Sequence, residues 1–141
     1  MTKSLYNPQH ISDVVITLER TMCYGTCPVY KLVVRGNGVL SYDGEYFVKV
    51  TGHQTATVSE AQIRDLLSEF KKAHYFALKD SYDSYDCTCM PDTITSLSVG
   101  GRTKRVFHYH GDCSAPKRLT RLEDAIDRIV DTGRWVKLRE F

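Results

Sequence analysis

The stretch that decides the fold is Tyr30-Lys31-Leu32-Val33-Val34-Arg35-Gly36-Asn37-Gly38-Val39-Leu40-Ser41-Tyr42. Within it, Tyr30, Leu32 and Val34 are apolar at alternate positions, which is the pattern of a half-buried strand. Asn-Gly suits a type I′ turn, because both central residues of that turn need a positive φ. The stretch therefore predicts a β-hairpin whose second strand covers Val39–Tyr42.

Outward from this hairpin, alternating apolar residues predict further strands. One strand precedes the hairpin, over Val14–Leu18. After the hairpin, Asp43-Gly44 is a second turn signal of the same kind, and it leads into the apolar residues Tyr46, Val48 and Val50. A fourth segment, over Thr55–Val58, ends this β-rich half.

A helix is predicted directly after these strands. Ser59-Glu60-Ala61-Gln62 has the form of a capping box, in which the Ser59 hydroxyl accepts from the Gln62 backbone and the Gln62 side chain reaches back. One apolar stripe at helical spacing follows, formed by Ile63, Leu66, Leu67 and Phe70. We expect this helix to end near Ala73.

The second half contains a long polar loop and another hairpin. The stretch Asp80–Asp92 is rich in tyrosine and polar residues and carries two cysteines, so we expect a loop there. Thr93–Val99 and Arg102–His110 then form a hairpin around Gly100-Gly101.

A second helix closes the chain. Ser114 or Thr120 could cap it, and Pro116 suits its first turn. Its apolar stripe is formed by Leu119, Leu122, Ile126 and Ile129, and Gly133 should stop it. A short apolar tail that docks on the domain then follows, with Trp135, Val136 and Leu138.

The order of these elements is ββββ-α-ββ-α. Strands joined by tight turns must pair antiparallel, and both helices can then cover one face of the sheet. We therefore predict an α+β fold, an antiparallel sheet with two helices packed on one face. Residues 1–12 should be a flexible N-terminal segment, and residues 13–141 a single α+β domain.

The net charge and the apolar patterns of the sequence limit which kinds of partner and which cellular location we expect. The net charge of +2 is too small to imply a nucleic-acid partner. We find neither a run of about 18 apolar residues nor an evident secretory signal, so we expect no membrane association and a cytoplasmic location, unless a signal has been removed. In a reducing cytosol, closely spaced cysteines favour metal or redox roles over disulfides.

The sharpest local motif is Cys23-Tyr24-Gly25-Thr26-Cys27-Pro28, placed where the first strand turns into the second. Two cysteines four apart around a glycine can form a disulfide or half of a tetrahedral metal site. A second cluster, Cys87-Thr88-Cys89, lies on the long polar loop. Weaker candidates are Cys113, beyond the last strand, and His108 and His110, which share one face of that strand.

Three interpretations of the cysteines stay open. They can be structural thiols or a disulfide, a zinc site formed by Cys23, Cys27, Cys87 and Cys89, or a redox pair at Cys23 and Cys27. Zinc is the cofactor that such a set of thiolates would hold. The histidines either ligate a metal or make ordinary hydrogen bonds at the surface.

Our leading hypothesis is a non-catalytic binding module whose two cysteine-bearing loops form one surface. Its contact residues would be Tyr24, Tyr82, Tyr85 and Asp86, and its partner a protein or a second copy of the chain. A structural zinc protein or a thiol-redox protein is the alternative. A hydrolytic enzyme ranks third, because no nucleophile and base can be paired from the sequence.

These residues also resemble a bacterial family known as a domain of unknown function, whose members carry C-[FY]-G-x-C-P-x-Y near the N-terminus. Here the motif is Cys23 to Tyr30, and the similarity covers about residues 13 to 131. The resemblance implies an α+β fold and supplies no activity. Many relatives are exported, which implies a Cys23–Cys27 disulfide in them. This chain departs from the pattern at Cys87, Cys89 and Cys113, which favours the metal hypothesis.

Overall fold

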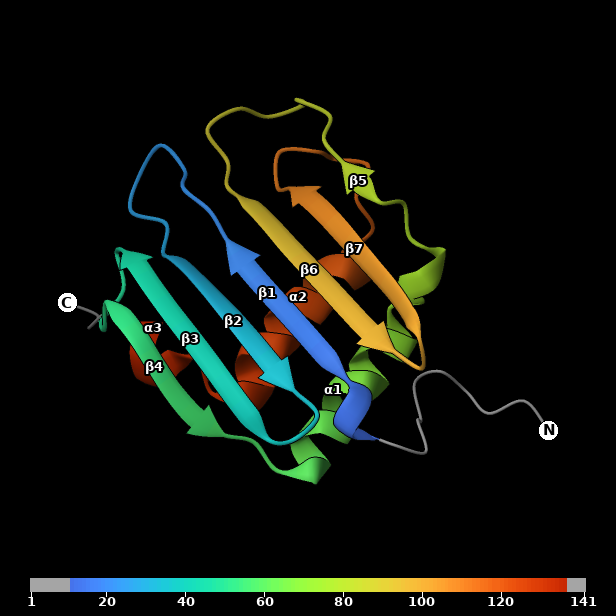
Figure 1. Cartoon of the computed structure of the whole chain (residues 1–141). Helices are drawn as coiled ribbons and strands as arrows, with labels where there is room; N and C mark the ends of the chain where they lie inside the picture. The colour runs from blue at the N-terminus through green and yellow to red at the C-terminus, as the bar shows by residue number, and fades with distance from the viewer. Residues whose placement is uncertain (1–10, 137–141) are drawn as a thin grey trace.

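Seven strands lie side by side in one sheet, and the helices lie behind it (Figure 1). The computed structural model describes residues 11–136 of the chain. The strands are β1 (Val15–Arg20), β2 (Val29–Arg35), β3 (Val39–Tyr46), β4 (Gly52–Thr57), β5 (Ser81–Tyr82), β6 (Asp92–Val99) and β7 (Arg102–Tyr109). The helices are α1 (Glu60–Lys72), α2 (Lys117–Val130) and the short α3 (Gly133–Val136), with 3₁₀ turns η1 (Ile11–Asp13) and η2 (Tyr75–Ala77).

The predicted α+β fold with two main helices on one face is confirmed. The strand order in the sheet is β4-β3-β2-β1-β6-β7-β5, and every pairing except β5 with β7 is antiparallel. No helix within residues 11–136 is long and apolar enough to cross a membrane. The expectation of a flexible start falls on residues 1–10, which lie outside the described part, while Ile11 begins η1.

The central hairpin forms between β2 and β3, but its turn differs from the predicted type. The Gly38 N–H donates to the Arg35 carbonyl at 2.9 Å, and Gly38 has a φ of 95°, whereas Asn37 does not adopt a positive φ. A type I turn closed by a glycine of positive φ forms a three-residue hairpin loop. Gly36 is needed for a different reason, because the Ile11 carbonyl packs where its Cβ would be.

The predicted turn at Asp43-Gly44 and the strand after it are wrong. β3 continues through both residues to Tyr46, and the chain turns later, with positive φ at Phe47 and Gly52. Gly44 packs directly against the Tyr42 hydroxyl and the Val50 carbonyl, so this glycine marks a close contact and not a turn.

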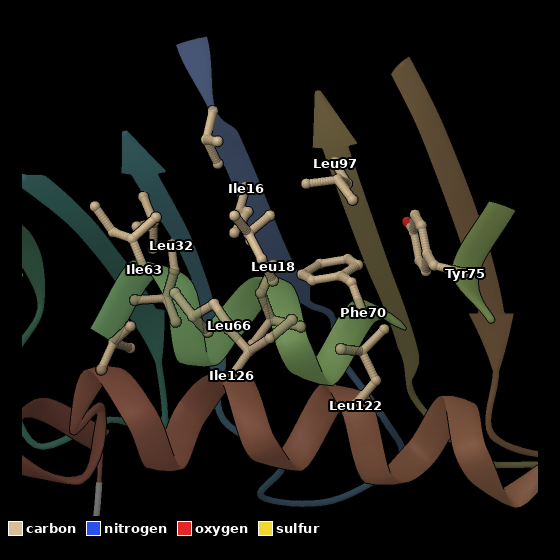
Figure 2. Packing of buried hydrophobic residues seen from close by; sticks show 14 of the residues in the cluster. Ile16, Leu18, Leu32, Ile63, Leu66, Phe70, Tyr75, Leu97, Leu122 and Ile126 are labelled. Carbon is tan, nitrogen blue, oxygen red and sulfur yellow. The ribbon is translucent and has the colours of Figure 1, made fainter. Parts of the chain in front are cut away.

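The core lies between the sheet and the helices (Figure 2). Helix α1 forms as predicted, with both hydrogen bonds of the Ser59–Gln62 capping box, at 2.8 and 3.1 Å. Its apolar stripe meets that of α2 and the inward residues of β1, β2 and β6. The labelled residues in this layer include Ile16, Leu18, Leu32, Ile63, Leu66, Phe70, Leu97, Leu122 and Ile126, each at most 1% exposed.

Helix α2 begins and ends differently from the prediction. Pro116 is its N-cap residue and supplies no side-chain cap, Thr120 lies inside the helix, and Ser114 binds Asp112 instead. The helix ends before Asp131, which has a φ of 58°, a conformation that aspartate tolerates. Gly133 therefore starts α3 instead of stopping α2.

The end of the described chain docks as predicted. Trp135 is buried and stacks on Tyr42, with ring centroids 4.7 Å apart, and the Val50 N–H donates to the Trp135 carbonyl at 2.8 Å. Leu138, the third residue of the predicted tail, lies outside the described residues.

Candidate functional site

Two loops emerge at the same end of the sheet, one between β1 and β2 and the other between β5 and β6 (Figure 1). They are neighbours because β1 pairs directly with β6, with Arg20 opposite Thr93. Thr21 and Asp92 extend this pairing, since the Thr21 N–H donates to the Asp92 carbonyl at 3.1 Å and the Asp92 N–H to the Thr21 hydroxyl at 3.0 Å. The sheet thus brings together the two cysteine-bearing loops.

The first loop is closed by a disulfide between Cys23 and Cys27, whose Cα atoms are 5.7 Å apart. Both sulfurs are therefore oxidised in this structure. The zinc site expected from Cys23, Cys27, Cys87 and Cys89 would first need this disulfide to be reduced, because zinc binds thiolates. The three remaining cysteines, Cys87, Cys89 and Cys113, are free and exposed.

A surface hollow of about 770 Å³ lies between the two loops. Cys23 and Cys89 both line it, and so do Tyr24 and Tyr85. The remaining lining residues are Met22, Thr88, Met90, Asp92 and Tyr109. Residues from both cysteine motifs therefore share one concave surface.

The second loop is held in place by the end of β7 and the turn that follows it. The Tyr109 hydroxyl donates to the Cys87 carbonyl at 2.6 Å, and the Cys87 N–H donates to the Gly111 carbonyl at 2.9 Å. The Asp86 carboxylate accepts from the Cys113 N–H at 2.9 Å. The Tyr85 ring packs on Tyr109 with centroids 4.5 Å apart, so the loop has a defined position on the sheet.

These contacts place Cys87 beside Cys113, whereas the predicted zinc site grouped Cys87 with Cys23, Cys27 and Cys89. Charge repulsion from Cys87 is the largest cause that raises the pKa of the Cys113 thiol, so the two side chains lie close together. Cys87 does not line the hollow, whereas Cys89 does.

The structure places the four predicted contact residues in three different settings. Tyr24 and Tyr85 are exposed in the hollow, at 91% and 74%. The assignment of Tyr82 to the surface is wrong, because pairing of β5 with β7 turns Tyr82 into the core, where it is 7% exposed. Asp86 is exposed but stays outside the hollow, where it accepts from Ser84 and Cys113 and so shapes the loop.

A buried polar cluster lies on the opposite face of the same strand ends. Side chains alternate along a strand, so Asp92 and Tyr109 line the hollow while Thr93, His108 and His110 face the helix layer. Helix α2 places Glu123 above the two histidines. The His108 Nδ1 lies 2.7 Å from Glu123 Oε2, and the two imidazole rings stack with centroids 4.1 Å apart.

Burial shifts the pKa values of two members of this cluster, Glu123 and His110. Desolvation raises the pKa of Glu123, although the hydrogen bond from His108 opposes that shift. Desolvation also lowers the pKa of His110 to about 4, so this imidazole is neutral at pH 7. The His110 Nε2 lies 2.6 Å from the Thr93 hydroxyl.

An ion-pair network borders the histidines. Arg20 on β1 donates to Asp127 on α2 at 2.9 and 3.0 Å and reaches Asp124 at 3.4 Å. The Tyr30 hydroxyl donates to the same Asp127 carboxylate at 2.8 Å. Desolvation is the largest cause that raises the pKa of Tyr30, so its hydroxyl stays protonated at pH 7.

The sequence patterns did not indicate four members of this cluster, namely Arg20, Tyr30, Glu123 and Asp127. Glu123 had a detectable signal, since it lies four residues after Leu119 and three before Ile126, on the apolar stripe of α2. A charged residue at such a position is almost never buried without a partner.

The chain matches a family model over residues 14–130, described as a domain of unknown function (DUF6438). The match runs from the start of β1 to the end of α2, so it contains both loops, the hollow and the buried cluster. No curated protein matches the sequence.

Proposed function

Since the chain belongs to the DUF6438 family of domains of unknown function, whose description names no activity, we propose a function from the site itself. The protein is a non-catalytic binding module. Its hollow between the β1–β2 loop and the β5–β6 loop holds a peptide segment of a partner protein.

The observation that carries this proposal is the distribution of exposed apolar side chains. Seven large apolar residues are exposed among residues 11–136, and four of them line the hollow, namely Met22, Tyr24, Tyr85 and Met90. Clustered exposed apolar groups mark interaction sites, whereas scattered ones are normal. Aromatic residues and methionine are also the types enriched in protein interfaces.

The openness of the hollow favours a peptide over a small molecule. Small ligands are usually buried over roughly 70–90% of their surface. Here Tyr24 and Tyr85 are 91% and 74% exposed, so the walls stand in solvent and cannot enclose a small ligand. A peptide that lies across the surface would cover both rings.

Charge indicates the chemistry of the bound segment. Asp92, the first residue of β6, lines the hollow, and Asp83 and Asp86 lie on the β5–β6 loop that precedes it. Among the lining residues that the structure describes, none is a lysine or an arginine. A segment with a basic residue beside an apolar or aromatic anchor would complement this surface. The disulfide and the hydrogen bonds of the second loop fix the hollow before binding, which reduces the entropy cost of association.

A random peptide library displayed on phage and selected against the full chain tests this function. We expect enriched peptides to combine an aromatic or aliphatic residue with lysine or arginine. Tyr24→Ser and Tyr85→Ser should each lower the affinity of the chain for a selected peptide by about tenfold or more, as expected for loss of an aromatic contact residue. The matched control is Tyr46→Ser, because Tyr46 is 55% exposed and lies outside the hollow.

Two results would contradict the binding function. One is a selection that enriches no peptide above background. The other is a selected peptide that loses as much affinity with Tyr46→Ser as with Tyr24→Ser. Both variants replace exposed side chains, so loss of folding does not confuse the comparison.

A thiol function is the second candidate, because Cys89 and the Cys23–Cys27 disulfide border the same hollow. Its two forms are thiol–disulfide exchange and, after reduction, a zinc site that includes Cys89. Zinc analysis of the reduced chain tests the metal form, and zinc content unchanged by Cys89→Ser would exclude it. Disulfides persist in oxidising compartments, so the redox state of this pair in cells also tests the predicted cytoplasmic location.

A further inference from the structure

We propose that His108, His110 and Glu123 bind a divalent first-row transition-metal ion of the zinc type, at a site separate from the hollow. One ligand atom from each residue lies within 4.8 Å of the other two. Two imidazoles and one carboxylate form a donor set that suits zinc and its neighbours in the first transition row.

Strand and helix geometry places the three donors together. His108 and His110 are two apart at the end of β7, so both rings point to the helix layer, and Glu123 on α2 lies above them. Donors bound to zinc at about 2.0–2.2 Å in a tetrahedron lie roughly 3.3 Å apart. Glu123 lies 2.7 Å from the His108 nitrogen and 3.5 Å from the His110 nitrogen, so small side-chain shifts would complete the arrangement.

An unsatisfied atom gives independent support. The Glu123 side chain is 1% exposed, and its Oε1 atom is buried without a hydrogen-bond partner. The His110 Nε2 lies 3.5 Å from Oε1. Buried carboxylate oxygens are nearly always satisfied, and one that is not calls for an explanation. A metal ion between Glu123 and His110 would satisfy this oxygen.

The hydrogen bonds described for the neighbouring Arg20 go to residues other than Glu123. Arg20 directs its hydrogen bonds to Asp127, Asp124, Tyr30 and Thr93, and two carboxylates already balance its charge. The hydrogen bonds of this guanidinium therefore leave the Glu123 carboxylate available to ligate a cation. The neutral imidazole is the form of histidine that ligates metals.

The competing explanation is a hydrogen-bonded His108–Glu123 pair that binds nothing. In that case the hydrogen bond between His108 Nδ1 and Glu123 Oε2 persists, and Oε1 stays unpartnered. The two explanations differ in one measurable property, which is saturable binding of a metal ion that depends on both His110 and Glu123.

Titration with Co²⁺ separates them. The tag-free full chain is treated with a chelator, dialysed and titrated while the visible d–d absorption is recorded. The same titration uses a Cys87→Ser/Cys89→Ser/Cys113→Ser background, which removes the free thiols as alternative ligands. We expect one Co²⁺ per chain in both proteins, displaced by Zn²⁺.

The ligand variants Glu123→Gln and His110→Gln are made in that background. Each should lower Co²⁺ affinity by more than the roughly 10- to 100-fold that outer-shell changes cost. His53→Gln is the matched control, because His53 also pairs with a carboxylate, Asp43 at 2.8 Å, but far from this site on β4. Its Co²⁺ affinity should not change.

Absence of saturable Co²⁺ binding in the background would overturn the site, and so would equal affinities in the ligand variants and His53→Gln. Circular dichroism checks folding. If Glu123→Gln is unfolded, His110→Gln decides the question, because the His110 side chain is 19% exposed and tolerates glutamine more readily. Neither result bears on peptide binding in the hollow, which none of these three residues lines.

Discussion

Asp127 is the residue that joins the helix layer to the sheet by charge. It accepts hydrogen bonds from Arg20 and Tyr30, and the Arg20 and Asp127 side chains are 18% and 22% exposed. Removal of its charge leaves the guanidinium without its closest partner in a partly desolvated position. We expect Asp127→Asn to lower the free energy of unfolding by about 2 kcal/mol, measured by urea denaturation.

Asp124 is the control for this change, because it contacts the same guanidinium at 3.4 Å but is 69% exposed. Water screens such a pair, so Asp124→Asn should change the free energy of unfolding by less than about 0.5 kcal/mol. If Asp127→Asn and Asp124→Asn lower the free energy of unfolding equally, burial does not determine how much each carboxylate contributes to stability.

The cysteines allow a second test at the residue scale. Cys87, Cys89 and Cys113 are free and exposed, whereas Cys23 and Cys27 are bonded to each other. Iodoacetamide added to the native protein should therefore modify three thiols per chain, and five after denaturation and reduction. Peptide mapping by mass spectrometry identifies them, and alkylation of Cys23 without prior reduction would argue against the disulfide.

Single-residue chemistry could be predicted from the sequence where the signal was local. The Cys23–Cys27 spacing already admitted a disulfide, because four residues around a glycine can bring two sulfurs together. The neighbours of Cys87 could not be predicted, since its contact with Cys113 depends on how the loop folds onto the end of β7. The sequence indicated His108 and His110 but not their partners, because Arg20 and Glu123 reach the histidines only through the pairing of β1, β6 and β7 under α2.

At the scale of an element, the start of α1 depends on its capping box. The Ser59 hydroxyl accepts from Gln62 N–H, and the Gln62 side chain also donates to the Ile129 carbonyl at 3.0 Å, which links α1 to α2. Ser59→Ala should lower the free energy of unfolding by about 1 kcal/mol, measured by thermal or urea unfolding. Ser68→Ala, an exposed change within the same helix, should leave it equal or slightly higher. If Ser59→Ala and Ser68→Ala have the same free energy of unfolding, the capping box does not stabilise α1 as expected.

The elements that the sequence predicted well are those with local causes. The alternation in β2 and β3, the capping box of α1 and the glycine pair between β6 and β7 each act within a few residues. Strand β5 could not be predicted, because two residues carry no periodicity and their parallel pairing with β7 comes from tertiary packing. Gly44 misled the prediction because a glycine signals a turn and a tight backbone contact equally well.

At the scale of the whole molecule, buried tyrosines connect the fold to pH. Tyr75 is fully buried and lies 2.9 Å from the Thr95 hydroxyl, and desolvation is the largest cause that raises its pKa above the ordinary value of 10.0. A group whose pKa is raised by folding stabilises the folded state below its unfolded pKa. That contribution is lost as the pH rises, because the unfolded chain loses the proton first.

We therefore expect the free energy of unfolding to fall above pH 10, with Tyr75 contributing up to about 1.4 kcal/mol per pH unit. Tyr75→Phe removes this titration, so the free energy of unfolding should fall less steeply between pH 10 and 11, whatever the variant loses at neutral pH. Tyr24→Phe is the control, because Tyr24 is 91% exposed and its change should leave the slope as it is. Urea unfolding at a series of pH values measures the slopes. If the Tyr75→Phe slope equals that of the wild type, the buried Tyr75 hydroxyl does not link folding to proton binding. The alkaline loss then comes from other groups, such as Tyr30 and Tyr42, whose pKa values desolvation also raises.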